Sequence, residues 1–265
     1  MLKIKRLSYL ERCQMAGHSQ FKNIMHRKGA QDKKKAKKFN KLAREITMAA
    51  KGGQPDPTVN SRLRNAIAEA RKENMASDRI KRAIEQANPN SADASNYEEI
   101  RYEGYGPGGV AVIVEALTDN RNRTAGDVRT AFAKNGGTMG ETNSVSFMFT
   151  KVGSIVFAGS VAADDKMFEA AVEAGAENVE SSGSVHEVTT QPTDFIHVKE
   201  ALEKKFGAAQ DSGIIWKPNN TIPVTQEQAK ELIELIEALE DYDDVQNVFT
   251  NFEVDEGVMA QLMAS

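Results

Sequence analysis

The sequence predicts a multidomain α+β protein: an N-terminal basic helical bundle, a discontinuous α+β middle domain and an inserted ferredoxin-like domain. Three observations support this fold class. Charge divides sharply along the 265 residues, because residues 1–90 hold 22 basic and 8 acidic side chains and the remainder holds 12 basic and 30 acidic ones. Apolar residues recur at helical spacing before residue 90 and alternate at strand spacing after it. The later helices and strands follow an order that suits one domain inserted into another.

Composition and turn signals set the domain boundaries. We expect the first fourteen residues to be an upstream-start artefact or a disordered tail, because Met15 resembles a true start and no secretory signal precedes it. The predicted domains are the extension at 1–14, the basic helical domain at 15–90, the middle domain at 91–150 and 221–265, and the ferredoxin-like insertion at 151–220.

Three amphipathic helices are predicted in the basic domain. The first covers residues 32–51, where apolar positions recur every three or four residues. The second is expected to begin with Asp56 as its cap and Pro57 at its first helical position, with Val59 turned inward. Ser77 is expected to cap the third.

Beyond the linker the pattern alternates between strands and helices. Thr124 with Asp127 resembles a capping box, and Val145, Phe147 and Phe149 alternate as if one face of a strand were buried. The predicted elements are strands at 99–103 and 110–117, a helix at 124–135, a strand at 144–150, a β-α-β-β-α-β series at 154–157, 165–174, 178–181, 185–189, 194–206 and 210–216, a helix at 226–239 and a strand at 245–252.

The last helix and the last strand cannot bury a core by themselves. The helix follows a capping box formed by Thr225 and Gln228. We therefore predict that both elements return to complete the sheet opened by residues 97–150, which makes the ferredoxin-like unit an insertion. The acidic surface of this helix is expected to be a solvated face rather than an interaction surface.

Motifs for catalysis or cofactor binding are missing from the sequence. Gly104, Gly106 and Gly109 form a G-x-G-x-x-G pattern, but a β-branched run follows them where a dinucleotide site needs a helix, so we predict a hairpin turn. No apolar run reaches the ~18 residues of a membrane-spanning helix. The sequence predicts no cofactor, no metal site and no catalytic residue, with an enzyme that has an unrecognised site as the remote alternative.

The basic segment 22–51 points instead to a polyanion. It holds eleven basic residues and two acidic ones, too few acids for i,i+4 pairs to neutralise it, although a solvated lysine-rich helix is the alternative. The segment 119–124 either holds an anion through its arginines and backbone N–H groups or is a capped turn whose arginines pair with nearby acids. The predicted nucleic-acid-binding residues are Lys22, His26, Arg27, Lys28, Lys33, Lys34, Lys35, Lys37, Lys38, Lys41 and Arg44, with Arg62, Arg64, Arg121 and Arg123 as secondary candidates.

Four collinear motifs resemble the YebC family: MAGHSQFKNIMHRK at 15–28, NSRLR at 60–64, YEGYGPGG at 102–109 and DNRNRT at 119–124. The chain departs from the family at Gln20-Phe21, where Lys-Trp is usual. The resemblance implies a three-domain fold and transcriptional regulation through DNA binding. It also implies an alternative, because members that include a mitochondrial activator of cytochrome c oxidase translation act on the ribosome and assist synthesis through proline-rich stretches.

We therefore expect a cytoplasmic, non-enzymatic regulator of gene expression that binds DNA through its basic N-terminal domain. The alternative is a translation factor that binds ribosomal RNA. Both need phosphate binding, and neither needs a membrane or a cofactor. The acidic α/β domains are expected to orient the basic domain or to contact proteins.

Overall fold

The structure is a computed structural model that describes residues 31–88, 90 and 96–255. It has a mixed α+β fold with seven α-helices among these residues, which confirms the α+β character of the predicted fold class. The chain divides into two compact units. One contains the described residues up to Val145 together with Thr225–Thr250, and the other contains Ser146–Val224 together with residues 251–255.

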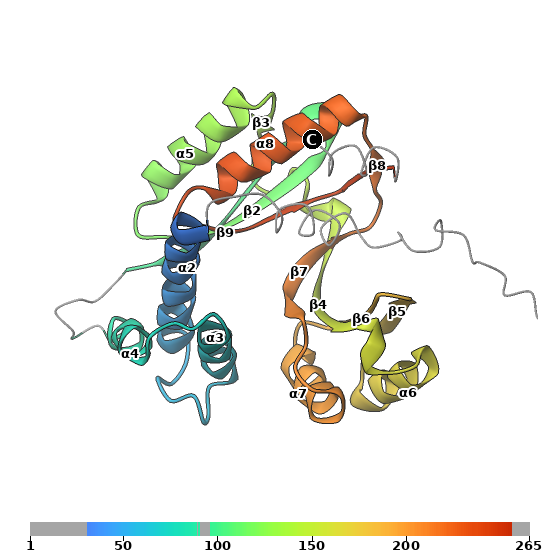
Figure 1. The fold of residues 1–265 in the computed structure, drawn as a ribbon. Helices are drawn as coiled ribbons and strands as arrows, with labels where there is room; N and C mark the ends of the chain where they lie inside the picture. Colours follow the sequence, from blue (N-terminus) through green and yellow to red (C-terminus); the bar gives the residue numbers. More distant parts are fainter. Residues whose placement is uncertain (1–30, 89, 91–95, 256–265) are drawn as a thin grey trace, which may run out of the picture. The chain divides into compact units, whose positions relative to one another are not determined.

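Three helices open the first unit (Figure 1), and their buried side chains form one apolar core. Ile46, Leu63 and Ile80, one from each helix, are buried in this core. The polar faces of the helices point outward, as their amphipathic sequences predict. The helices are α2 (Gln31–Lys51), α3 (Ser61–Lys72) and α4 (Ser77–Glu85).

The predicted helix starts need correction in two places. Helix α3 is capped by Asn60, whose side chain accepts a hydrogen bond from the backbone N–H of Leu63. Asp56 closes a turn ahead of the helix instead, because its carboxylate accepts hydrogen bonds from both the backbone N–H and the hydroxyl of Thr58 at 2.8 Å. Val59 is consequently 64% exposed rather than inward. Helix α4 begins at Ser77, so this serine is its first residue and not its cap.

The sheet of the first unit has the strand order β3-β1-β2-β9. Strand β9 pairs antiparallel with β2, so the last helix and strand complete this sheet, as predicted. Helices α5 and α8 lie against it (Figure 1). The elements are β1 (Glu98–Tyr105), β2 (Ala111–Thr118), α5 (Arg121–Lys134), β3 (Thr138–Met139), α8 (Gln226–Glu240) and β9 (Val245–Thr250).

Capping residues and a glycine turn determine where the helices and strands of this unit begin and end. Thr225 and Gln228 form the predicted capping box at the start of α8. The glycine-rich motif is the predicted turn between β1 and β2, where Gly108 has a φ of 72° that suits glycine. The prediction that Thr124 caps α5 is wrong. The helix starts three residues earlier, with Asn120 as its cap, and Thr124 is buried within it.

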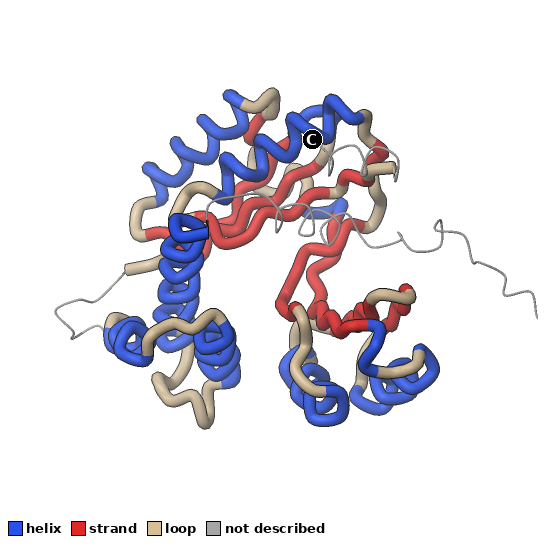
Figure 2. The backbone as a smooth tube through the Cα atoms, in the orientation of Figure 1, coloured by secondary structure: helices blue, strands red, loops and turns tan. Residues whose placement is uncertain are grey.

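The second unit contains a sheet with the strand order β5-β6-β4-β7, in which all neighbouring strands are antiparallel. Its elements follow the predicted β-α-β-β-α-β order, and Figure 2 shows both helices on one side of the sheet. The division of the chain into three domains stays a prediction. The elements are β4 (Phe149–Ala158), α6 (Asp164–Ala174), β5 (Asn178–Ser182), β6 (Val185–Thr190), α7 (Phe195–Phe206) and β7 (Asp211–Pro218).

Two strand boundaries differ from the sequence prediction. The expected strands 144–150 and 154–157 form one strand, β4, behind a 3₁₀ turn at Ser146–Met148. This turn breaks the alternation, so Phe147 is 69% exposed instead of buried. The expected strand 245–252 is split at Asn251, after which β10 (Phe252–Glu253) pairs with β8 (Ile222–Pro223) in the second unit.

Candidate nucleic-acid interface

The predicted binding residues cluster on and before α2, and part of them lies outside the described structure. Lys22, His26, Arg27 and Lys28 fall outside the described residues. The backbone of Lys33 and Lys34 belongs to α2, but the structure does not describe their side chains. Lys35 and the candidates that follow it in the chain are described with their side chains.

Lys37 and Lys41 point toward the C-terminal end of α8. The Nζ atom of Lys37 lies 2.7 Å from a carboxylate oxygen of Asp241 and 2.9 Å from its backbone carbonyl. The Nζ atom of Lys41 donates to the carbonyl of Glu240 at 3.1 Å. Burial lowers the pKa of Lys41, and the nearby carboxylates only partly oppose this effect. Both lysines therefore have partners within the chain.

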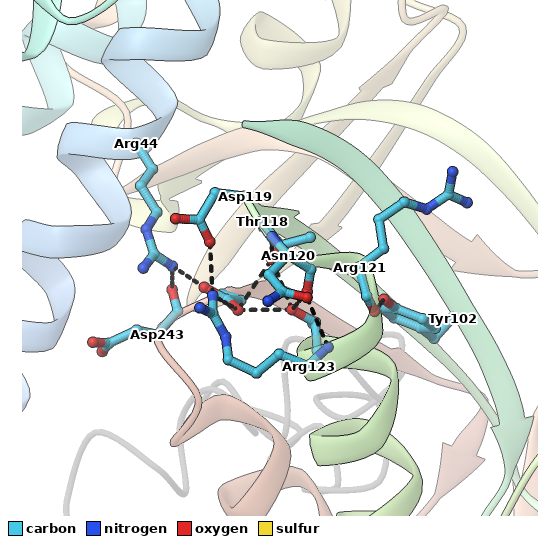
Figure 3. A network of polar contacts seen from close by, with 10 residues as sticks. Arg44, Tyr102, Thr118, Asp119, Asn120, Arg121, Arg123 and Asp243 are labelled. Carbon is cyan, nitrogen blue, oxygen red and sulfur yellow. Dashed lines mark hydrogen bonds and ion pairs between the residues drawn. The ribbon is translucent and has the colours of Figure 1, made fainter. Parts of the chain in front are cut away.

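Arg44 extends the same contact by one turn of α2. Its guanidinium lies 2.9 Å from a carboxylate oxygen of Asp244 and also donates to the backbone carbonyl of Asp243 (Figure 3). The guanidinium carbon lies 5.4 Å from the centroid of the Tyr97 ring, within the range of a cation–π contact. With its side chain only 17% exposed, Arg44 joins α2 to the loop between α8 and β9.

Asp244 is the centre of this network. Its side chain is 8% exposed and accepts hydrogen bonds from Arg123 at 2.8 Å, from Thr124 at 2.7 Å and from Thr118 at 3.2 Å. Burial alone would raise the pKa of Asp244, but the bonds from Arg123 and Thr124 and the charges of both arginines lower it below its usual value. The carboxylate therefore stays ionised where α2, β2 and α5 meet.

The segment 119–124 has the geometry of a capped turn. Asn120 caps α5 by accepting from the backbone N–H of Arg123, and the Arg123 guanidinium lies 2.8 Å from Asp119. Arg121 differs, because its side chain is 70% exposed and lies 3.9 Å from Glu98. Figure 3 shows Arg121 directed away from the network. This geometry matches the alternative of arginines that pair with nearby acids, and nucleic-acid binding by them stays a prediction.

The remaining candidates also have partners within the chain. Arg62 donates to Glu45 and to Glu99, and although burial opposes it, these two carboxylates raise the pKa of the guanidinium. Arg64 donates to backbone carbonyls in the turn before α3. The Nζ atom of Lys38 lies 2.9 Å from Glu73.

Four exposed cations in the helical region lack such partners. The side chains of Lys51, Arg71, Lys81 and Arg82 make no ion pair or hydrogen bond within the described part of the chain. Lys35 is also exposed, with its Nζ atom 5.7 Å from the centroid of the Phe39 ring. None of these four is among the binding residues predicted from the sequence, although their position opposite the apolar faces of α2, α3 and α4 is a signal for them.

The described residues lack two kinds of site: a cluster of metal ligands and a bilayer-spanning helix. Nowhere among them do three His, Cys, Asp or Glu side chains gather as metal ligands would. None of the described helices combines the length and apolar composition that a bilayer-spanning segment requires.

Two family models together match most of the chain. Residues 97–252 match the second and third domain of TACO1/YebC, and residues 19–90 match the TACO1/YebC N-terminal domain. The chain belongs to the TACO1/YebC family. A crystal structure of a conserved hypothetical protein from Aquifex aeolicus is 43% identical and superposes with a TM-score of 0.79, covering 88% of this chain and 96% of that one. Membership of the TACO1/YebC family supports a role like that of a transcriptional regulator at the family level.

Proposed function

We propose that this chain is a non-enzymatic, cytoplasmic regulator of transcription that binds DNA through its basic N-terminal helices. The observation that carries the proposal is the set of four exposed, unpaired cations on α2, α3 and α4: Lys51, Arg71, Lys81 and Arg82. An unpaired cation can meet a phosphate without first breaking an internal ion pair. The regulator-like role of the TACO1/YebC family supports the same function.

Counterion release is the expected source of affinity. Each phosphate that a protein neutralises lowers the slope of log K against log salt by about 0.9 for duplex DNA. Four contacts therefore give a slope of about −3.6, equivalent to a loss of roughly 100-fold between 50 and 200 mM salt. Basic residues outside the described part of the chain would steepen this slope.

Backbone recognition suits these helices better than base reading. The selected side chains are lysines and arginines, which bind phosphates, and aromatic residues are 6% of the sequence, too few for a broad base-stacking surface. Shape and charge would then determine which nucleic acid binds. Ribosomal RNA presents the same phosphate chemistry, so RNA binding is an outcome that the experiment must separate from DNA binding.

The experiment compares two full-length variants that lose the same charge. One replaces Lys51, Arg71, Lys81 and Arg82 with alanine, and the control replaces the exposed cations Arg129, Lys134, Lys166 and Lys204 on α5, α6 and α7. Duplex DNA and a ribosomal RNA fragment are titrated with each variant at several salt concentrations. We expect the first variant to lose roughly 100-fold in DNA affinity and the control to lose no more than about threefold.

Three outcomes would contradict the proposal. Equal losses in both variants would show that binding follows only overall charge. Cosedimentation with ribosomes that the first variant abolishes, together with weaker binding to duplex DNA, would favour the translation factor instead. Turnover of a small molecule by the purified protein would favour an enzyme.

A further inference from the structure

The outer face of α6 carries two large apolar side chains. Phe168 and Val172 are each 56% exposed, and they lie four residues apart, so they occupy the same face of the helix. Met167, Ala170 and Ala171, by contrast, face inward and are buried in the core of the second unit. We call Phe168 and Val172 the α6 ridge.

Helix α8 shows that an exposed ridge is not a general feature of this chain. Its solvent-facing positions include Glu231 and Glu234, whereas Leu232, Leu235 and Ile236 are buried. A surface helix normally has this distribution, with polar residues outside and apolar ones inside. Folding therefore gives no reason for the α6 ridge, since its two side chains contribute little to the core of the unit.

Acidic side chains border the ridge. At 100° per residue, Asp165 and Glu169 follow Val172 around the helix on one side, and Asp164 lies beside Phe168 on the other. All three acids are exposed. Among the described residues, no lysine or arginine pairs with these three acids, and the one basic group beside them is a ring nitrogen of His186, 3.8 Å from Asp164. A complementary partner surface would therefore have an apolar strip with basic side chains along its border.

We propose that the outer face of α6 docks a basic, amphipathic helical segment of a partner protein. Apolar side chains of the partner would cover Phe168 and Val172, and its lysines or arginines would meet Asp165 and Glu169. The same acids repel nucleic acid and anionic lipid. The ridge lies in the second unit, so this proposal does not depend on the nucleic-acid-binding function proposed for the first.

The contact would be small and reversible. Two apolar residues one turn apart span about 6 Å of helix, far less than the apolar core of a permanent interface. We expect a dissociation constant on the order of 10 μM that weakens as salt increases, because rim charges contribute through screened attraction.

The test uses a designed helix as the probe. A fluorescein-labelled peptide of about 18 residues carries leucines along one face and lysines along both flanks, and a matched peptide has glutamates in place of the lysines. Fluorescence polarisation measures both peptides against the full-length protein. We expect the basic peptide to bind at least about tenfold more tightly than the acidic one.

Three double variants locate the contact. F168S/V172S removes the ridge, and D165K/E169K reverses its border. E231K/E234K makes the same charge change on α8 and serves as the control. We expect about a tenfold loss with each of the first two and less than about twofold with the control. Thermal unfolding followed by circular dichroism should show little change, because all of these positions are exposed.

Several results would overturn the proposal. The basic peptide could fail to bind at concentrations up to about 200 μM. F168S/V172S could bind it with unchanged affinity, or the α8 control could lose as much affinity as the α6 variants. Sedimentation velocity that finds a dimer in the unmodified protein but not in F168S/V172S would identify a second copy as the occupant. Vesicles of neutral lipid that bind only the unmodified protein would identify a membrane surface.

Discussion

Each basic side chain on α2 or on α4 carries one formal positive charge, but the surroundings of these charges differ between the two helices. On α2, Lys37, Lys41 and Arg44 make contacts with the C-terminal end of α8 and the loop that follows it. On α4, Lys81 and Arg82 are exposed, and their side chains make no ion pair or hydrogen bond within the described part of the chain. The first set stabilises the unit, and the second remains available to a polyanion.

This difference shows that a count of charges along the sequence overstates the charge available for binding. The acids that meet α2 lie far away in the sequence: Lys37 and Asp241 are 204 residues apart. No rule based on neighbouring positions in a helix can find such a pair.

The largest effect is expected from replacing Asp244 with alanine. The change leaves Arg44, Thr118 and Thr124 without their shared acceptor in a buried place. Removing one partner of a buried ion pair costs about 3 to 5 kcal/mol, so urea unfolding should show a loss of about 4 kcal/mol. The control D241A removes an exposed carboxylate and should cost about 1 kcal/mol or less. Equal losses would mean that Asp244 is not the centre of the network.

The next effect concerns nucleic-acid affinity. K81A/R82A and K37A/K41A remove the same formal charge, from the unpaired and the paired set respectively. We expect the first pair to cost roughly tenfold in DNA affinity and to reduce the salt slope by about 1.8. The second pair should cost less than about threefold, because Lys37 is paired with Asp241 and the largely buried Lys41 donates to the carbonyl of Glu240. Fluorescence polarisation across a salt series measures both, and a larger loss in K37A/K41A would reverse the comparison.

A smaller effect is expected from acid. Because the pKa of Asp244 is lowered in the folded protein, its ionised form contributes stability that is fully present above its usual value of 3.8. This contribution is lost as the pH falls below about 4 toward the folded pKa. The unmodified protein should therefore lose on the order of 1 kcal/mol more than D244N between pH 7 and pH 3 in urea unfolding. Parallel pH curves would contradict the assignment.

The smallest effect tests whether the paired lysines can be released. D241N/D243N neutralises two exposed carboxylates beside α2 and should raise DNA affinity about threefold, because Lys37 loses its ionic partner. E231Q/E234Q removes the same charge from the exposed face of α8, away from these contacts. If both variants gain equally, the change reflects net charge alone and not the release of α2.

Local signals predicted much of the fold. The spacing of apolar residues located α2 to within a residue, and the capping box of Thr225 and Gln228 marked the start of α8. Predicted element boundaries were wrong where a nearby residue took the capping role or a turn interrupted a strand. Asn60 replaced Asp56 as the cap of α3, and a 3₁₀ turn around Phe147 ended the expected alternation.

The candidate site was less predictable than the fold. Sequence alone selected α2 for its density of lysines, and the motif at 119–124 for its arginines. The structure pairs Arg44 and Arg123 with one carboxylate, Asp244, and leaves Arg71 and Lys81 exposed. Whether a cation is paired depends on which acid folds against it, and that acid belongs to a different element.

The amino-acid sequence by itself determined the kinds of elements, their order and the family, because periodicity, caps and motifs act over a few neighbouring residues. Only the tertiary structure decided which positive charges remain free. Electrostatic pairing acts through space over a few ångströms, so Asp244 can neutralise Arg44 only after the chain has returned β9 to the side of β2.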